Sequence, residues 1–413
     1  MNRPAFAIAA VLLAALALVA GAAEAAPLHL VRVVLVTRHG VRPPTQSNAE
    51  LAKYADKPWP DWPVAPGELT PHGGETVKLV ADTVRETYRS AGLLPKHGCA
   101  GAGEVTTWAD GADQRTRESG RIFAEAVQPG CGAAAPFADT HPRDPIFGGS
   151  DKGVCQIDAG ELKAAMAAAA IDPSVTAIDV GPATARLQAI YAPDACKGGA
   201  GTCFTPADNA STPQTRAFPA AGSLAEDLLL EYGDGKPMSD VGWGRATAAD
   251  IAAVMPLHER VYAQMRATPP VVFHRGAPMA RVILAALAGR PAAGGPQSGP
   301  TLKLLTLSGH DTNIALMGAV FGVKPWTLPG QPDGTAPASA LAFELWSDGQ
   351  RQYLRPVMFY ETLDQLRTLQ PATARMLPLS FSQCGAPGPN GSCGLGEVAR
   401  RVEARLPANC PPT

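Results

Sequence analysis

The chain has 413 residues, with 35 Lys and Arg against 37 Asp and Glu and a hydrophobic content of 46%. A chain of this length can bury a sizeable core and form one to three domains. Its net charge of −2 excludes a strongly basic surface, so the composition does not indicate nucleic acid or an anionic membrane as a partner. Any charge that binds anions must therefore be local.

Residues 1–26 predict a secretory signal peptide. Arg3 supplies a positive charge, residues 6–20 form an uncharged run of mainly Ala, Leu and Val, and Ala-Glu-Ala at 23–25 fits a cleavage site. An anchoring helix is the alternative, but this run is shorter than the about 20 apolar residues that usually span a bilayer. No later stretch is apolar enough to span one. We expect a periplasmic or secreted protein without a membrane contact after cleavage.

The first charged motif follows residues 31–36, whose β-branched and aliphatic side chains predict a buried strand. Residues 37–44 read TRHGVRPP, and the carboxyl end of a parallel strand is where α/β folds place their chemistry. Arg38 and Arg42 present planar, permanently charged groups that suit phosphate oxygens. His39 is a candidate nucleophile, because neighbouring cations disfavour a protonated imidazole. The alternative is a charged loop that caps a strand around a hydrogen-bonded histidine.

The next region predicts a loop, a helix and a second strand. Residues 45–70 are rich in Pro and Trp and predict an irregular loop, and residues 71–89 predict a helix. A strand at 105–110 then leads to Arg115 and to a helix that ends near residue 127. Arg115 is a candidate third clamp for phosphate; the alternative is a solvated arginine at the start of a helix.

The second half of the chain predicts a helical insertion followed by more strands. Residues 151–267 contain Ala-rich helical segments around a Gly/Ser/Thr/Pro loop at 196–213. Strands return beyond residue 268, at residues 271–273, 302–307, 341–346 and 353–359. We predict an α/β fold whose mixed, mostly parallel sheet is flanked by helices. Residues 27–150 and 268–413 would form this domain, and 151–267 a second, mostly helical domain.

The second charged motif, His310-Asp311, directly follows the strand predicted at 302–307. A bare His-Asp pair also fits a helix N-terminus with an acidic cap. Together with the first motif it predicts phosphoryl transfer, in which the arginines and His310 hold the phosphoryl oxygens. His39 would form a phosphohistidine, and Asp311, protonated, would donate to the leaving alkoxide and then activate water. The sequence shows no set of residues at metal-ligand spacing, so we expect no metal ion and no cofactor.

The cysteines predict a disulfide framework. All eight lie beyond the predicted signal peptide, and an even number in an exported protein indicates four disulfides. Spacing favours two local pairs across Gly-rich loops, Cys196 with Cys203 and Cys384 with Cys393, and it leaves the other pairing open.

Both charged motifs resemble those of a known family. RHGVRPPT and GHDTNIALMGAVFG are similar to the two motifs of the histidine acid phosphatases, and WPDWPV, LTPHGGE, DQRTR, GWGR and WTLPGQPDGT are similar to stretches of the bacterial periplasmic phytases within that family. The resemblance covers nearly the whole mature chain. It implies an α/β domain beside a helical domain, with the active site between them. The disulfides it implies are Cys99–Cys131, Cys155–Cys410, Cys196–Cys203 and Cys384–Cys393.

The resemblance also implies roles for single residues. It makes His39 the residue that becomes phosphorylated and Asp311 the general acid. The phosphate-binding residues that it implies are Arg38, Arg42, Arg115 and His310. The substrate contacts that it suggests are Thr45, Glu226, His258 and Arg275.

The leading hypothesis is a monomeric periplasmic acid phosphatase of phytase type, acting on a small phosphomonoester such as myo-inositol hexakisphosphate. Gln46 and Ser223 depart from residues that phytases often have, Lys and a larger side chain. A glucose-1-phosphatase or broad sugar-phosphate phosphatase is therefore an alternative with the same mechanism, although its motif usually reads HDSN rather than HDTN. A non-catalytic phosphate-binding protein would need only the arginines. A cytoplasmic enzyme related to phosphoglycerate mutase would lack the signal peptide and the disulfides.

Overall fold

The structure is a computed structural model that describes residues 27–139, 144–148, 154–205, 220–292, 295–408 and 410. The predicted signal peptide at 1–26 lies outside the described residues, as does part of the loop predicted at 196–213. Across the described ranges, none of the helices is both long and apolar enough to cross a lipid bilayer.

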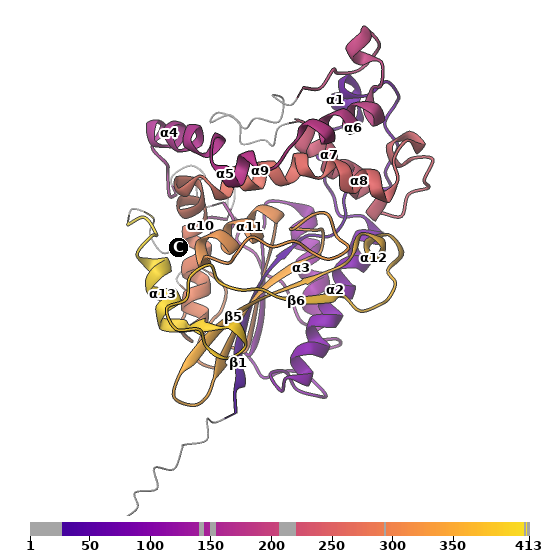
Figure 1. The fold of residues 1–413 in the computed structure, drawn as a ribbon. Coiled ribbons are helices and arrows are strands. Elements are labelled where there is room, and N and C mark those ends of the chain that lie inside the picture. The colour runs from indigo at the N-terminus through magenta and orange to yellow at the C-terminus, as the bar shows by residue number, and fades with distance from the viewer. Residues whose placement is uncertain are drawn as a thin grey trace, which may run out of the picture.

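A mixed sheet lies at the centre of the α/β part (Figure 1). The described strands run in the order β2-β3-β1-β4-β5-β6, and β7 pairs with β5. β2, β3 and β1 form a parallel core, and β4 to β7 extend it in antiparallel fashion. The bounds are β1 His29–Arg38, β2 Val105–Ala109, β3 Leu304–Gly309, β4 Ala340–Ser347, β5 Gln352–Tyr360, β6 Arg375–Pro378 and β7 Cys393–Gly394. The predicted α/β class, a mixed sheet flanked by helices, is confirmed.

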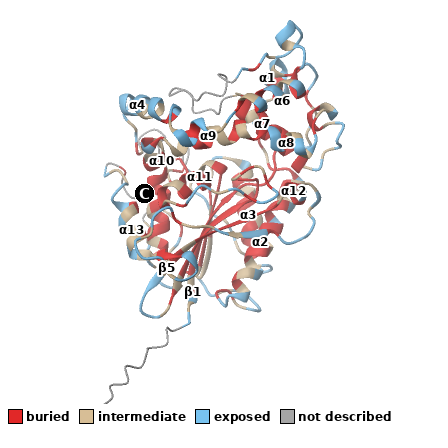
Figure 2. Ribbon diagram, in the orientation of Figure 1, coloured by how far each residue is buried: buried red, intermediate tan, exposed pale blue. Residues whose placement is uncertain are grey.

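Helices cover both faces of the sheet, which explains the nearly continuous apolar sequence of β1 (Figure 2). Successive side chains of a strand point to opposite faces. Val33 and Leu35 accordingly pack with α2 and α3, whereas Val34 and Val36 pack with α10, α11 and α13. The bounds of these helices are α2 Pro71–Ser90, α3 Gln114–Val127, α10 Pro269–Leu287, α11 Asp311–Phe321 and α13 Leu395–Glu403.

A layer of helices lies at the end of the sheet where β1 finishes (Figure 1). It contains α4 Ala159–Ala170, α5 Pro173–Thr176, α6 Gly181–Tyr191, α7 Ala220–Gly233, α8 Ala248–Val254 and α9 Pro256–Arg266. Its buried cluster includes Leu187, Leu228 and Leu257. Trp59 and Leu51, from the first 70 residues, belong to the same cluster, so the early loop packs against this layer. The domain boundaries stay a prediction.

The early loop, predicted to be irregular, contains two single-turn helices. The short helices of the described residues are α1 Asn48–Leu51, α12 Leu363–Thr368, η1 Ala52–Tyr54, η2 Ala195–Lys197, η4 Val241–Gly244 and η5 Pro389–Gly391. Most of the longer predicted elements agree with the structure, including the helix predicted at 71–89 and the strands predicted at 341–346 and 353–359.

The strand predicted at residues 271–273 is wrong, because these residues lie in α10. Pro269 and Pro270 occupy the first two helical positions, where the missing N–H costs nothing. Val272 and Phe273 are buried against the sheet as part of a helix face. A short β-branched run cannot be assigned to strand or helix from its apolar pattern alone.

The four disulfides implied by the resemblance are present, including both local pairs favoured by spacing. Every cysteine of the sequence takes part in one of them. Cys155–Cys410 joins positions 255 residues apart and so ties the C-terminal end of the chain back to the segment that precedes α4.

Candidate active site

Three strand ends bring the charged motifs together. β3 lies between β1 and β2, with Arg38 opposite Gly309 and Ala109 opposite Ser308. All three strands are parallel, so their carboxyl ends meet at one edge of the sheet, where α/β folds bind ligands. The residues that directly follow these strands are His39, Asp110 and His310. The structure thus unites the two motifs that the sequence placed at strand ends.

The turn after β1 is held by close packing against α2. A Cβ atom at Gly40 would lie 2.1 Å from the carbonyl oxygen of Gly73, in the first turn of α2. Only glycine lets the two backbones approach this closely. Thr70 caps the start of that helix, because its side chain accepts a hydrogen bond from the Gly73 N–H at 2.8 Å. The start of α2 therefore fixes the position of the His39 turn.

His39 has the protonation state that a nucleophile needs. Its side chain is buried, and its Nδ1 lies 2.8 Å from the carbonyl oxygen of Gly40. A carbonyl only accepts, so Nδ1 carries the proton and Nε2 presents a lone pair. Burial and the charges of Arg115, Arg42 and Arg38 lower the pKa of His39 well below its ordinary value. Both effects therefore favour the neutral imidazole, as the sequence predicted for a histidine among cations.

Arg38 is fully buried and held on two sides. Its Nη1 donates to Oδ2 of Asp333 at 2.8 Å and to the carbonyl oxygen of Thr335 at 2.7 Å. Its Nη2 pairs with the carboxylate of Glu226 and lies 3.3 Å from Oδ2 of Asp311. Three carboxylates thus surround a single guanidinium group.

Two arginines keep unused donors. Nε of Arg38 and Nε of Arg42 are buried and have no hydrogen-bond partner among the described residues. A buried donor left unsatisfied costs about 1–3 kcal/mol, and an incoming phosphoryl oxygen would satisfy it. Arg42 also lies 3.2 Å from Glu226 through its Nη2. Its charge and that of Arg38 both act on His39, so these donors belong to one anion site.

Arg115 reaches the same site from the start of α3. Its Nη1 donates to the carbonyl oxygen of Gly67 at 3.2 Å and lies 3.2 Å from Oδ1 of Asp113. Among the neighbouring charges, that of Arg115 lowers the pKa of His39 most. The sequence thus identified all three arginines that act on His39.

The charges around Asp311 favour its ionised form. Burial alone would raise its pKa, but the charges of Arg38, His258 and His310 outweigh burial and lower the pKa below its ordinary value. The residue begins α11, where the helix dipole also favours a negative charge. Asp311 can therefore act as an acid only if it gains a proton when substrate binds.

His310 faces both His39 and two carboxylates. The two imidazole rings meet edge to face with their centroids 5.6 Å apart. Nε2 of His310 lies 2.9 Å from Oδ2 of Asp110 and 3.5 Å from Oδ2 of Asp113. This nitrogen is thus engaged by Asp110, and a phosphoryl group would compete with that contact.

The four suggested substrate contacts differ in position. Glu226 contacts Arg38 and Arg42 directly, and His258 is buried close enough for its charge to lower the pKa of both Glu226 and Asp311. Thr45 directly follows residues 37–44 and is exposed, and Arg275 is half-buried on α10. Their roles as substrate contacts stay predictions.

Asp110 and Asp333 contact the site, but the sequence did not identify them as site residues. Asp110 directly follows β2, so the rule that chemistry gathers at parallel strand ends could have found it. Asp333 lies in a loop with no strand before it and contacts Arg38 from 295 residues away. The local sequence around Asp333 does not predict a contact with a residue so far away in the chain.

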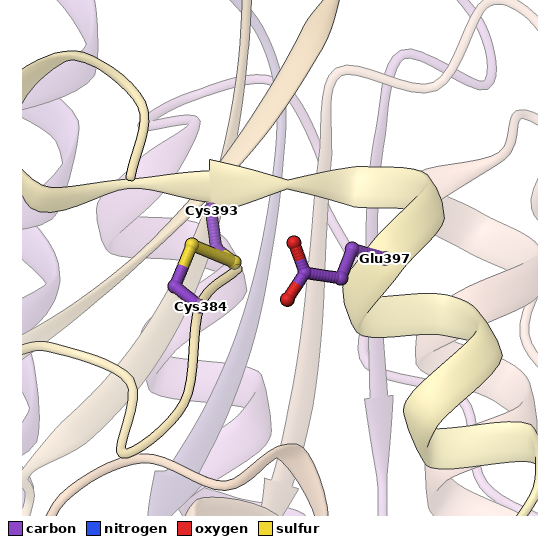
Figure 3. Close-up of side chains that lie close together, drawn as sticks. All are labelled: Cys384, Cys393 and Glu397. Atoms are coloured by element: carbon purple, nitrogen blue, oxygen red, sulfur yellow. A yellow bond between two sulfur atoms is a disulfide. The ribbon is translucent and has the colours of Figure 1, made fainter. Parts of the chain in front are cut away.

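Two groups of described residues have the proximity that metal ligands need. Figure 3 shows the first, in which Cys384 and Cys393 form a disulfide beside Glu397 of α13. Disulfide sulfurs are not the thiolates that bind metals, so this group does not suit a metal. The second consists of Asp110, Asp113 and His310, where Asp110 already contacts the imidazole. The expectation of a metal-free site stays a prediction.

The sequence of residues 29–358 matches the family described as the histidine phosphatase superfamily, branch 2. The chain belongs to this family. It is 33% identical to phytase AppA of Escherichia coli strain K12 over 413 aligned residues, covering 92% of this chain and 93% of that protein. A glucose-1-phosphatase of Providencia rettgeri is 25% identical and aligns with 83% of each chain.

Solved structures show the same relationship. The Hafnia alvei phytase in complex with myo-inositol hexakis sulphate has a TM-score of 0.83 and 31% identity, covering 93% of this chain and 98% of that one. The Citrobacter braakii phytase has a TM-score of 0.82 and 28% identity, covering 93% and 99%. The predicted family is thus confirmed, and both of these similar structures are phytases.

Proposed function

We propose that this protein is an acid phosphatase of phytase type that hydrolyses phosphomonoesters through a phosphohistidine on His39. One observation carries the proposal: a buried, neutral imidazole with its Nε2 lone pair available stands among three arginines that act on it electrostatically. The arginines supply the charge stabilisation that phosphoryl transfer mainly requires. A site that only bound phosphate would not need a nucleophile kept neutral.

Substrate would bind with its phosphoryl group before His39. Nε of Arg38 and Nε of Arg42 would donate to phosphoryl oxygens, with Arg115 and His310 completing the site. Glu226 pairs with both arginines, so its carboxylate would have to move or reorient when the phosphoryl group binds. We expect the dianion to neutralise part of the arginine charge that keeps Asp311 ionised, so that Asp311 takes up a proton on binding.

The chemistry would then proceed in two displacements. Nε2 of His39 attacks phosphorus, the bond from phosphorus to the ester oxygen breaks, and Asp311 gives its proton to the leaving alkoxide. Asp311, now ionised, takes a proton from water as that water attacks phosphorus. The phosphorus–nitrogen bond breaks and His39 is neutral again. Asp311 loses the proton that it took from water as inorganic phosphate leaves, and so returns to its ionised state. The organic product is the alcohol.

Among substrates we favour myo-inositol hexakisphosphate, since the 33% identical relative and the similar structures are phytases. Glucose 1-phosphate is the second candidate, because a glucose-1-phosphatase is related over 83% of the chain. Gln46 follows the motif and is exposed beside Thr45, and as a neutral side chain it offers an inositol phosphate no charge. We also propose periplasmic or secreted location, a monomer, and a helical domain at 151–267.

A substrate panel tests the proposal. Initial rates at acidic pH are measured with phytate, glucose 1-phosphate and p-nitrophenyl phosphate, using wild type and His39→Ala. We expect wild type to hydrolyse all three, with the highest kcat/KM for phytate, and the variant to hydrolyse none. A higher kcat/KM for glucose 1-phosphate would assign the alternative substrate, and no turnover of any ester would overturn the proposed function.

A further inference from the structure

Residues 326–335, WTLPGQPDGT, take no part in the proposed mechanism, yet one of them contacts Arg38 in the site. β4 follows it, and its residue Asp333 is 2% exposed. Oδ2 of Asp333 accepts from Nη1 of Arg38 at 2.8 Å, and the carbonyl oxygen of Thr335 accepts from the same nitrogen at 2.7 Å. Nη1 is thereby committed to protein acceptors.

The other end of the guanidinium group has a different environment. Nη2 of Arg38 contacts Glu226 and Asp311, the two carboxylates that we expect to change partner or protonation state with substrate. Nε has no partner among the described residues. The donors offered to a phosphoryl group are therefore Nε and Nη2, and Asp333 is the carboxylate that can stay in place throughout turnover.

Asp333 is itself fixed by donors on both oxygens. Its Oδ1 accepts from the Thr335 N–H at 2.8 Å and from Oγ1 of Thr335 at 3.1 Å, while Oδ2 accepts from Arg38. Gln331 holds the loop in place: its Oε1 accepts from the Asp333 N–H at 3.2 Å, and its Nε2 donates to the carbonyl oxygen of Glu361 at 3.0 Å. The segment from Gln331 to Thr335 thus connects Arg38 to Glu361, the residue that follows β5.

The chain just beyond the loop supports the catalytic turn as well. Ala338 adopts a φ of +61°, which is strained for a residue with a side chain. In this conformation its N–H donates to the carbonyl oxygen of His39 at 2.9 Å. The N–H of Arg38 donates to the carbonyl oxygen of Ser339, also at 2.9 Å. One segment therefore holds the backbone of the motif as well as the Arg38 side chain.

We propose that Asp333 is a positioning residue that locks the Arg38 guanidinium, so that Nε and Nη2 face the phosphoryl group. The inference rests on the proposed phosphatase function and adds a residue that touches neither substrate nor the reacting atoms. Asp333 would act wholly through Arg38. Its loss should therefore weaken phosphate binding and turnover alike for every ester, because all esters share the phosphoryl group.

Asp333→Asn is the direct perturbation. Both oxygens of the Asp333 carboxylate accept hydrogen bonds. An amide in its place has one oxygen that accepts and one NH₂ group that donates. The NH₂ group would face a donor, either Nη1 of Arg38 or the N–H of Thr335. The guanidinium should reorient, and a misplacement of about 1 Å can cost on the order of 100-fold in rate. We expect kcat/KM to fall by about 10- to 100-fold, by similar factors for phytate and p-nitrophenyl phosphate.

A double-mutant cycle separates positioning from general structural damage. Arg38→Ala and the double variant Arg38→Ala/Asp333→Asn are compared with wild type and Asp333→Asn. If Asp333 acts through Arg38, the double variant has the kcat/KM of Arg38→Ala within about twofold. A further loss in the Arg38→Ala background as large as that in wild type would overturn the proposal. Asp348→Asn is the matched control and should retain full activity, because Asp348 is half-buried in the β4–β5 turn and follows Ser347, which pairs with His29 at the opposite end of β1 from Arg38.

Binding of inorganic phosphate makes the test independent of turnover. Titration calorimetry at acidic pH should show weaker phosphate binding for Asp333→Asn than for wild type, and equal binding for Arg38→Ala with and without the second change. If wild type hydrolyses no ester, the proposed function fails while this comparison still decides the role of Asp333. Should Asp333→Asn not fold, Thr335→Val removes one donor to Oδ1. Thr335→Val should lower kcat/KM several-fold in the wild-type background and leave it unchanged in the Arg38→Ala background. A similar loss of kcat/KM in both backgrounds would refute the inference.

Discussion

We predict that buried Glu231 makes the stability of this protein depend on pH. The residue lies on α7 and is 1% exposed, with Oε2 accepting from the Gly242 N–H at 2.9 Å. Burial raises its pKa from the ordinary 4.5 to about 8, against the lowering effect of that hydrogen bond. The native state therefore binds this proton more tightly than the unfolded state. Stability should fall as pH rises between about 4.5 and about 8, where only the native carboxyl keeps its proton.

Glu231→Gln removes the titrating group and keeps an oxygen for Gly242. Each pKa unit corresponds to about 1.4 kcal/mol, so the full gap corresponds to roughly 4–5 kcal/mol as an upper bound. For a chain of this size that is a rise of about 5 °C in Tm. We expect equal Tm values for wild type and variant at pH 4, and a higher Tm for the variant at pH 8.

Thermal unfolding followed by circular dichroism from pH 4 to pH 8 measures the effect. Glu75→Gln on α2 is the matched control, because Glu75 is exposed. Its Tm should follow that of wild type at every pH. A Tm difference between Glu231→Gln and wild type that is the same at pH 4 and pH 8 would refute the reasoning, because a change of packing alone does not depend on pH.

Three further predictions concern the site and the covalent framework. Asp311→Asn should slow hydrolysis of phytate or glucose 1-phosphate by about 10²- to 10⁴-fold and p-nitrophenyl phosphate much less, since nitrophenolate leaves without a proton; equal losses would assign the acid elsewhere. Arg42→Ala is the matched comparison for Asp311→Asn. It should slow hydrolysis of both ester types by similar factors, because both share the phosphoryl group. Activity should persist in excess EDTA, and a loss reversed by Mg²⁺ or Zn²⁺ would contradict the metal-free site. Thiol titration of the folded, oxidised protein should find no reactive cysteine, whereas two titratable thiols would show an open disulfide.

The meeting of the two charged motifs could be predicted from sequence because each motif has a local signature. His39 and His310 each follow a buried apolar strand, and parallel strands deliver their carboxyl ends to one edge. Arg115 was found in the same way, after the short strand β2. The spacing of the cysteines also predicted Cys196–Cys203 and Cys384–Cys393, because the two cysteines of each pair are close in the chain.

Other features depend on distant contacts that leave no local pattern. The ionised state of Asp311 results from the summed charges of groups on several elements. The packing of Trp59 against the helical layer follows from the path of the early loop. The start of α10 looked like a strand because Val271, Val272 and Phe273 favour strands by composition, whereas the contacts that stabilise a helix there lie on other elements.

The central claim is that His39 carries the phosphoryl group. Wild type and His39→Ala are mixed with radiolabelled phosphomonoester at acidic pH, quenched within milliseconds in base, and mapped by proteolysis. The account predicts a base-stable, acid-labile label on the peptide that contains His39, and no label and almost no turnover in the variant. A labelled intermediate that survives in His39→Ala would contradict the account.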